Sequence, residues 1–169
     1  CVSLHCPAQA KERLLHWVSR GAMDIDGMGE EIVGRLIEKG LLKDVSDFYR
    51  LNEYELATLD MDRTNKAGES IRLGKLVASK LVTAIENSKK LPLSRLLFGL
   101  GIRHVGKNTA VEICKAFPSM DRLMAASEEE LSVTEGVGEK IAESLYMFLR
   151  TPDNVKVIES LKALGLNME

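Results

Sequence analysis

Four glycine-bearing segments contain the residue types best suited to chemistry in this sequence. They are IDGMGEEIVGRLIEKG (25–40), IRLGKLVASKLVTAIENS (71–88), GIRHVGKNTAVEICKAF (101–117) and TEGVGEKIAESLYMFL (134–149). Each places an apolar residue directly before a glycine, followed by a polar residue and an amphipathic helical pattern. The glycine leaves the backbone N–H groups at the helix start uncovered, where they lack intrahelical partners and the helix dipole is positive. Such a turn is suited to binding a phosphate or another anion.

We predict that the glycines and the residues beside them form the binding surface. The predicted contacts are Gly27, Gly29, Leu73, Gly74, Lys75, Arg103, His104, Val105, Gly106, Lys107, Asn108, Thr109, Gly136, Val137, Gly138 and Lys140. The third turn is the best phosphate candidate because Arg103, His104 and Lys107 surround it. Backbone contacts to phosphates carry no base information, so binding to a duplex would be largely independent of its sequence.

The first turn has the opposite charge. It lies among four carboxylates, those of Asp24, Asp26, Glu30 and Glu31. Carboxylates repel a phosphate, so this copy is expected to be a scaffold or a protein contact. The same group could hold a divalent cation. We favour the simpler interpretation, a solvated acidic turn with charges at a helix start.

The second turn departs from the pattern in another way. Arg72 stands where the first glycine of the pair would be, so a contact at Gly74 is a weaker prediction than one at Gly106. The polar stretch DMDRTNKAGES (60–70) before it is interpreted as an inserted loop.

Helices must position these turns, and the sequence predicts an all-α fold. PAQAKERLLHWVSRG (7–21) reads as a helix with Trp17 in the core, and NEYELATL (52–59) as a short helix capped by Asn52. TPDNVKVIESLKALG (151–165) has a capping threonine, a proline in the first turn and a glycine at the stop. No stretch alternates as a strand would. The repeated unit is therefore helix, glycine-bearing turn, helix.

Composition narrows the class of protein. The 169 residues are 45% apolar and 28% charged, with no apolar run long enough for a membrane span. Because the net charge is −2, local geometry rather than bulk charge would have to hold a nucleic acid. No signal peptide opens the chain, which starts with Cys rather than Met, so we expect a fragment of a longer protein.

The cysteines predict no disulfide framework. Their odd number is typical of a reducing cytoplasm. Cys114 fits the apolar pattern of a helix, whereas the separation of Cys1 and Cys6 is compatible with half of a zinc site. We find no Walker loop, no adenylation lysine motif and no other catalytic constellation.

Longer stretches around the turns resemble one family. PLSRLLFGLGIRHVGKNTA (92–110) is similar to the third helix-hairpin-helix segment of bacterial NAD-dependent DNA ligases. The stretches at 25–51 and 135–149 resemble their first and fourth segments, and 1–29 resembles the passage out of their four-cysteine zinc module. The resemblance covers essentially the whole chain, in the family's order.

The resemblance implies four tandem helix-hairpin-helix motifs behind a short zinc-module remnant. The implied division is 1–6 for the remnant, 7–21 for a connecting helix, 22–165 for the helix-hairpin-helix domain and 166–169 for the start of a linker to a missing domain. Cys1 and Cys6 would be the last two of four zinc ligands, so the site would be incomplete in this chain.

The resemblance also implies a function. The chain would be the non-catalytic part that grips double-stranded, nicked DNA in a cytoplasmic, nucleoid-associated bacterial ligase of replication and repair. NAD and a divalent metal would bind to domains outside it, it would bind no small-molecule substrate, and it would be inactive alone. Its partners would be DNA and the remaining ligase domains. The alternative is a helix-hairpin-helix module used for protein contacts or in another DNA-repair protein.

Overall fold

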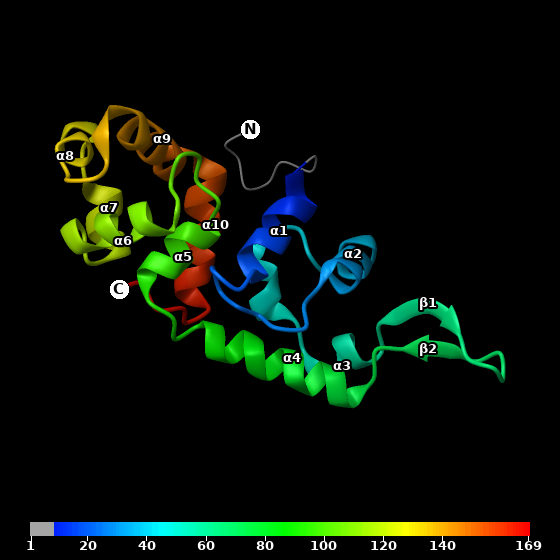
Figure 1. Ribbon diagram of the computed structural model, residues 1–169. Coiled ribbons are helices and arrows are strands. Elements are labelled where there is room, and N and C mark those ends of the chain that lie inside the picture. The colour runs from blue at the N-terminus through cyan, green and yellow to red at the C-terminus, as the bar shows by residue number, and fades with distance from the viewer. Residues whose placement is uncertain (1–8) are drawn as a thin grey trace.

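Helices make up most of the structure, a computed structural model that describes residues 9–169 (Figure 1). The longer helices are α1 (Ala10–Val18), α2 (Glu30–Glu38), α4 (Lys75–Ser88), α6 (Lys107–Ala116), α9 (Gly138–Arg150) and α10 (Pro152–Ala163). The shorter ones are η2 (Val45–Arg50), α3 (Glu53–Ala57), α5 (Leu93–Gly99), α7 (Met120–Ala125) and α8 (Glu128–Ser132). The predicted all-α class is confirmed.

Across residues 9–169, no helix has both the length and the apolarity to cross a membrane. The predicted zinc ligands Cys1 and Cys6 lie outside the described residues.

The polar stretch predicted as a loop is instead a small β-hairpin. Strands β1 (Asp60–Thr64) and β2 (Ser70–Arg72) pair antiparallel and project from the helices (Figure 1). The Asn65 side chain accepts hydrogen bonds from the N–H groups of Ala67 and Glu69 and so closes the turn between them. Because nearly all the strand side chains are exposed, the sequence has no alternation of apolar and polar residues to reveal them.

Helices that flank a glycine turn pack against each other. The packed pairs are α1 with α2, α3 with α4, α5 with α6, and α8 with α9. The β-hairpin interrupts the second pair without separating it. The N–H of Leu73 donates to the Leu59 carbonyl at 3.0 Å, and that of Gly74 to the Ala57 carbonyl at 3.0 Å. The insertion therefore returns the chain to the end of α3 just before α4 begins.

One apolar core joins these pairs. Trp17 is fully buried, as predicted, and its indole N–H donates to the Tyr49 hydroxyl at 3.2 Å. That hydroxyl lies 2.9 Å from the Ser88 hydroxyl, which ties α1, η2 and α4 together. Burial raises the pKa of Tyr49 to about 12.

The predicted first helix is shorter than the expected 7–21. It ends at Val18, and Ser19 is already extended. The chain turns there because the N–H groups of Met23 and Ile25 donate to the carbonyls of Trp17 and Val18. Those bonds use the last helix carbonyls, so Gly21 does not cap the helix.

The C-terminal end of the chain packs against the domain. Thr151 stands at the N-cap position of α10, but its hydroxyl donates to the Met147 carbonyl at 2.8 Å instead of capping the helix as predicted. Pro152 lies in the first turn and a left-handed Gly165 follows the helix, both as predicted. Residues 166–169, which we expected to begin a linker, continue into the fold. Leu166 is buried, and the Glu169 carbonyl accepts a 2.8 Å hydrogen bond from the N–H of Leu93.

Candidate nucleic-acid interface

The first and third glycine turns have nearly the same backbone. Gly29 is the N-cap of α2 with φ −87° and ψ −174°, and Gly106 is the N-cap of α6 with φ −87° and ψ −177°. In each turn the apolar residue before the glycine, Met28 or Val105, is buried as predicted. In both turns the buried apolar side chain packs against the core, while the glycine that follows it remains exposed.

The residue two positions before each of these glycines has a left-handed backbone. Gly27 has φ +89°, and His104 has φ +70° at the equivalent place. Glycine adopts this conformation without steric cost, whereas histidine does so at some cost. The third turn therefore keeps the same geometry without its first glycine.

The second and fourth turns differ from this pair. Gly74 precedes α4 with φ +90° and ψ 158°, and Gly138 begins α9 with φ +70°. Gly136 is also left-handed, with φ +82°, and Val137 between the two glycines is buried. In these two turns the backbone conformation is itself sufficient reason for a glycine before the helix.

At Gly29 and Gly106 neither packing nor conformation requires a glycine. Apart from its neighbours along the chain, a Cβ placed at either position would have no atom within 4 Å, and the negative φ suits any L-residue. An apposed partner that must reach the bare backbone would account for the absence of a side chain at both positions.

The helix starts after the glycine turns have no side-chain caps. None of α2, α4, α6 and α9 has a side chain that accepts a hydrogen bond from its first turn. The neighbouring short helices do: Asn52, Ser119 and Ser127 cap α3, α7 and α8. Polar side chains therefore cap several helix starts of the chain, whereas all four helices that follow the glycine turns leave their first N–H groups for another acceptor.

Away from the glycine turns, α1, α5 and α10 also lack a side-chain cap among the described residues, and the last two have local explanations. At the start of α5, the N–H of Leu93 donates to the Glu169 carbonyl. Helix α10 begins at Pro152, which has no N–H to satisfy.

The third turn has the most favourable charge. Arg103, His104, Lys107 and Asn108 are exposed there, and Thr109 is half-buried. The lysines predicted at the other turns, Lys75 and Lys140, are exposed as well, whereas Leu73 and Gly74 are half-buried. Val105 and Val137, which we also predicted as contacts, are buried, so they can support the turns but not touch a ligand.

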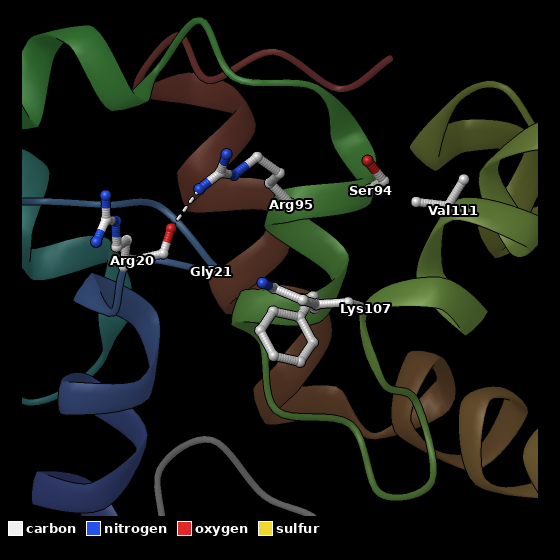
Figure 2. Close-up of a pocket in the computed structure, with 7 residues that line it drawn as sticks. Arg20, Gly21, Ser94, Arg95, Lys107 and Val111 are labelled. Atoms are coloured by element: carbon white, nitrogen blue, oxygen red, sulfur yellow. Dashed lines mark hydrogen bonds between the residues drawn. The ribbon is translucent and has the colours of Figure 1, made fainter.

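Lys107 extends away from its own turn into a cationic cleft (Figure 2). The cleft has a volume of about 460 Å³ and is lined by Arg20, Gly21, Ser94, Arg95, Phe98, Lys107 and Val111, with no carboxylate among them. The Arg95 side chain is fixed by hydrogen bonds to the carbonyls of Ala22 (2.7 Å) and Arg20 (2.5 Å). The end of the Lys107 side chain lies over Gly21, in the space that a Cβ there would occupy.

Sequence reasoning missed Arg20 and Arg95 as members of this surface. They lie far from Lys107 in the chain and carry no glycine motif of their own. Arg20 lies in WVSRG, just after α1, and Arg95 lies in PLSRLLFGLG, within α5. Neither stretch indicates that the two side chains come together. Fold-level packing alone brings the three cations together.

The first turn is less acidic than its sequence suggests. Lys11 on α1 lies 3.4 Å from a Glu30 carboxylate oxygen, and Arg63 on the β-hairpin lies 3.1 Å from one of Glu31. Within residues 9–169, no group of three or more His, Cys, Asp or Glu side chains is arranged to hold a metal ion. The carboxylates around the first turn thus lie in ion pairs or face solvent.

The third and fourth turns form one unit. The Ser144 hydroxyl on α9 donates to the Arg103 carbonyl at 2.6 Å. A Cβ at Gly136 would lie 3.4 Å from Cγ of Glu112 on α6, so the fourth turn lies against the third helix pair. Their spacing is therefore fixed by direct contacts.

Cys114 is half-buried on α6 and packs against the core. Burial raises the pKa of its thiol to about 11. It therefore stays protonated at neutral pH and acts as a packing residue, as the helical pattern predicted.

Comparison with known proteins shows which proteins this chain is similar to. Residues 95–158, which contain the third and fourth turns, match the helix-hairpin-helix motif. The whole chain is 41% identical to part of the DNA ligase of Koribacter versatilis, covering 24% of that protein. It is 44% identical over 99% of its length to part of the DNA ligase of Methylacidiphilum infernorum, and 42% identical over 99% to that of Halalkalibacterium halodurans.

These matches confirm the resemblance to DNA ligases that we inferred from the sequence motifs. NAD dependence and zinc stay predictions, and so does the assignment of the first two helix pairs as further copies of the motif. The chain spans about a quarter of the length of these ligases, 24% and 23% for the first two. From end to end, the chain is therefore similar to one segment of these DNA ligases, and its residues 95–158 match the helix-hairpin-helix motif.

Proposed function

We propose that this chain is a non-catalytic DNA-binding segment of a DNA ligase that grips duplex DNA around a nick. The grip is largely independent of sequence, because backbone N–H groups at the glycine turns bind phosphates rather than bases. The observation that carries the proposal is the contrast between the bare helix starts after the turns and the side-chain caps on α3, α7 and α8.

The third turn is the main contact in this proposal. Its helix start is bare, Gly106 has open space in front of it, and its surface carries Arg103, His104 and Lys107. The cleft beside it adds Arg20 and Arg95, which could hold a second phosphate of the same strand. This local concentration of donors and cations offsets the net charge of −2.

The remaining parts of the reaction belong to other domains. We propose that NAD and the catalytic divalent metal bind outside this segment, and that Cys1 and Cys6 complete a zinc site with upstream ligands. The segment alone therefore seals no nicks. Its partners are nicked duplex DNA and the other ligase domains, in the bacterial cytoplasm with the nucleoid, during replication and repair.

A protein contact is the second candidate, and one observation favours it. Glu128, Glu129, Glu139 and Glu143 line a cleft with Ser132 beside the fourth turn, where they would repel a DNA phosphate. This face suits a basic protein surface better than a nucleic acid.

Fluorescence anisotropy tests the proposal. Labelled nicked and intact duplexes of two unrelated sequences are titrated with the chain at low and moderate salt. We expect similar affinity for both sequences, a preference for the nick, and weaker binding as salt rises. The absence of binding at low salt would contradict the proposal and favour the protein contact, whereas binding confined to one sequence would contradict the backbone-mediated grip and indicate base readout.

A further inference from the structure

The β-hairpin lies beside the first glycine turn rather than standing alone. Strand β1 contacts α2, the helix that begins at that turn, and the hairpin extends outward from there (Figure 1). Its root is held by buried Met61 and by the hydrogen bond between Leu73 and Leu59. The base of the hairpin is therefore anchored to the helical core.

Two ion pairs cross from the hairpin to α2. A guanidinium nitrogen of Arg63 lies 3.1 Å from a carboxylate oxygen of Glu31, and one of Arg35 lies 3.4 Å from a carboxylate oxygen of Asp62. The charges alternate across the contact, because each element supplies one cation and one anion. The contact thus selects one register between the strand and the helix.

Glu31 has a direct effect on the function of the first turn. It lies in the first turn of α2, where its negative charge interacts favourably with the helix dipole. A phosphate approaching Gly29 would meet this charge and that of Glu30. Each of these two glutamates forms an ion pair with a cation from another element: Glu31 with Arg63 of the hairpin, and Glu30 with Lys11 of α1.

We propose that the β-hairpin is a charge-compensating arm of the first glycine turn: Arg63 neutralises Glu31, and a DNA phosphate can then approach the bare backbone at Gly29. This inference rests on the DNA-binding function proposed above. It assigns a positioning role to Arg63, which acts through Glu31 and does not itself bind the phosphate. It also gives the inserted segment a function that its slightly acidic composition, Asp60, Asp62 and Glu69 against Arg63 and Lys66, does not suggest.

A double-mutant cycle tests the inference. In low salt, Arg63→Ala should weaken binding to a nicked duplex about threefold, because an exposed ion pair of this kind has a modest energy. Glu31→Gln should bind at least as tightly as the wild type. The double variant should return to the wild-type affinity, since the unpaired carboxylate is gone.

Two control variants separate this mechanism from others. Arg50→Ala removes an exposed arginine that pairs with Asp47 on η2, and it should leave binding unchanged. Lys66→Ala removes a cation in the loop of the hairpin and should also leave binding unchanged. Circular dichroism and the thermal transition of each variant must match the wild type, which keeps loss of folding apart from loss of binding.

The outcomes are distinct. Wild-type affinity for Arg63→Ala would overturn the inference while leaving the DNA-binding proposal intact. Weaker binding that Glu31→Gln does not restore would also overturn it, because Arg63 would then contact DNA directly. Failure of the wild-type chain to bind DNA would overturn both proposals together.

Discussion

The first and third glycine turns have the same backbone and opposite surroundings. Both cap their helices with an extended glycine at φ −87°, behind a buried apolar residue. Around Gly29 the side chains are mainly acidic, whereas around Gly106 they are mainly basic. Backbone geometry and surface charge therefore vary independently in this fold. The geometry allows a turn to bind an anion, and the surrounding charge sets how strongly the turn binds that anion.

The largest effect is expected from Gly106→Val. The valine fits the backbone and the open space, so the fold survives, but its side chain blocks the phosphate from the N–H groups. Loss of charge-assisted hydrogen bonds should weaken DNA binding about tenfold or more. Anisotropy with a nicked duplex measures this loss.

Gly29→Val is the matched control for that variant, because both positions have the same backbone and open space. It should lose clearly less affinity, since the acidic turn contributes less to the grip. Equal losses at the two turns would show that charge does not rank them.

The next prediction compares how much Gly138→Ala and Gly106→Ala reduce the free energy of unfolding. Because Gly138 has φ +70°, Gly138→Ala forces a side chain into the left-handed region and should reduce the free energy of unfolding by about 1 kcal/mol. Gly106→Ala should cost less, about 0.5 kcal/mol, because its φ is negative and only the N-cap preference for glycine over alanine is lost. Urea denaturation of both variants measures the difference, and similar losses would contradict the assigned conformations.

Lys107→Ala should have a smaller effect on binding. It removes one cation from the cleft with Arg20 and Arg95 and leaves the backbone of the third turn unchanged. We expect about a threefold loss, nearly equal for different DNA sequences, and a salt dependence reduced by about one released ion. Titrations at several salt concentrations measure the slope. A loss restricted to one sequence would mean that the lysine reads bases.

The smallest effect is expected from the double change Asp24→Asn and Asp26→Asn. Both carboxylates are exposed beside the first turn, so their removal should tighten DNA binding about twofold at low salt. At moderate salt the gain should disappear through screening. Anisotropy at the two salt concentrations gives both values, and weaker binding would show that these aspartates take part in the contact.

Much of the fold could be predicted from local signals. The cap at Asn52, the proline and glycine that bound α10, and the buried Trp17 follow from side-chain chemistry within a few residues. The β-hairpin could not be predicted, because its exposed strands have no apolar face and its turn depends on the Asn65 side chain.

The candidate site divides in the same way. The glycine turns and their buried anchors, such as Val105, were visible because they lie within one short motif. The cleft at Lys107 and the pairing of Glu31 with Arg63 were not, since they depend on how distant elements pack. Charge read along the chain therefore overestimated how acidic the first turn is.

The most direct test of backbone-mediated binding follows the amides themselves. Amide proton and nitrogen chemical shifts of the ¹⁵N-labelled chain are recorded while a nicked duplex is added. Backbone-mediated binding should produce large shifts for Gly106, Lys107 and Asn108 at the start of α6, and smaller ones for Gly29. Binding that leaves the amides at these helix starts unchanged would rule out backbone-mediated contact.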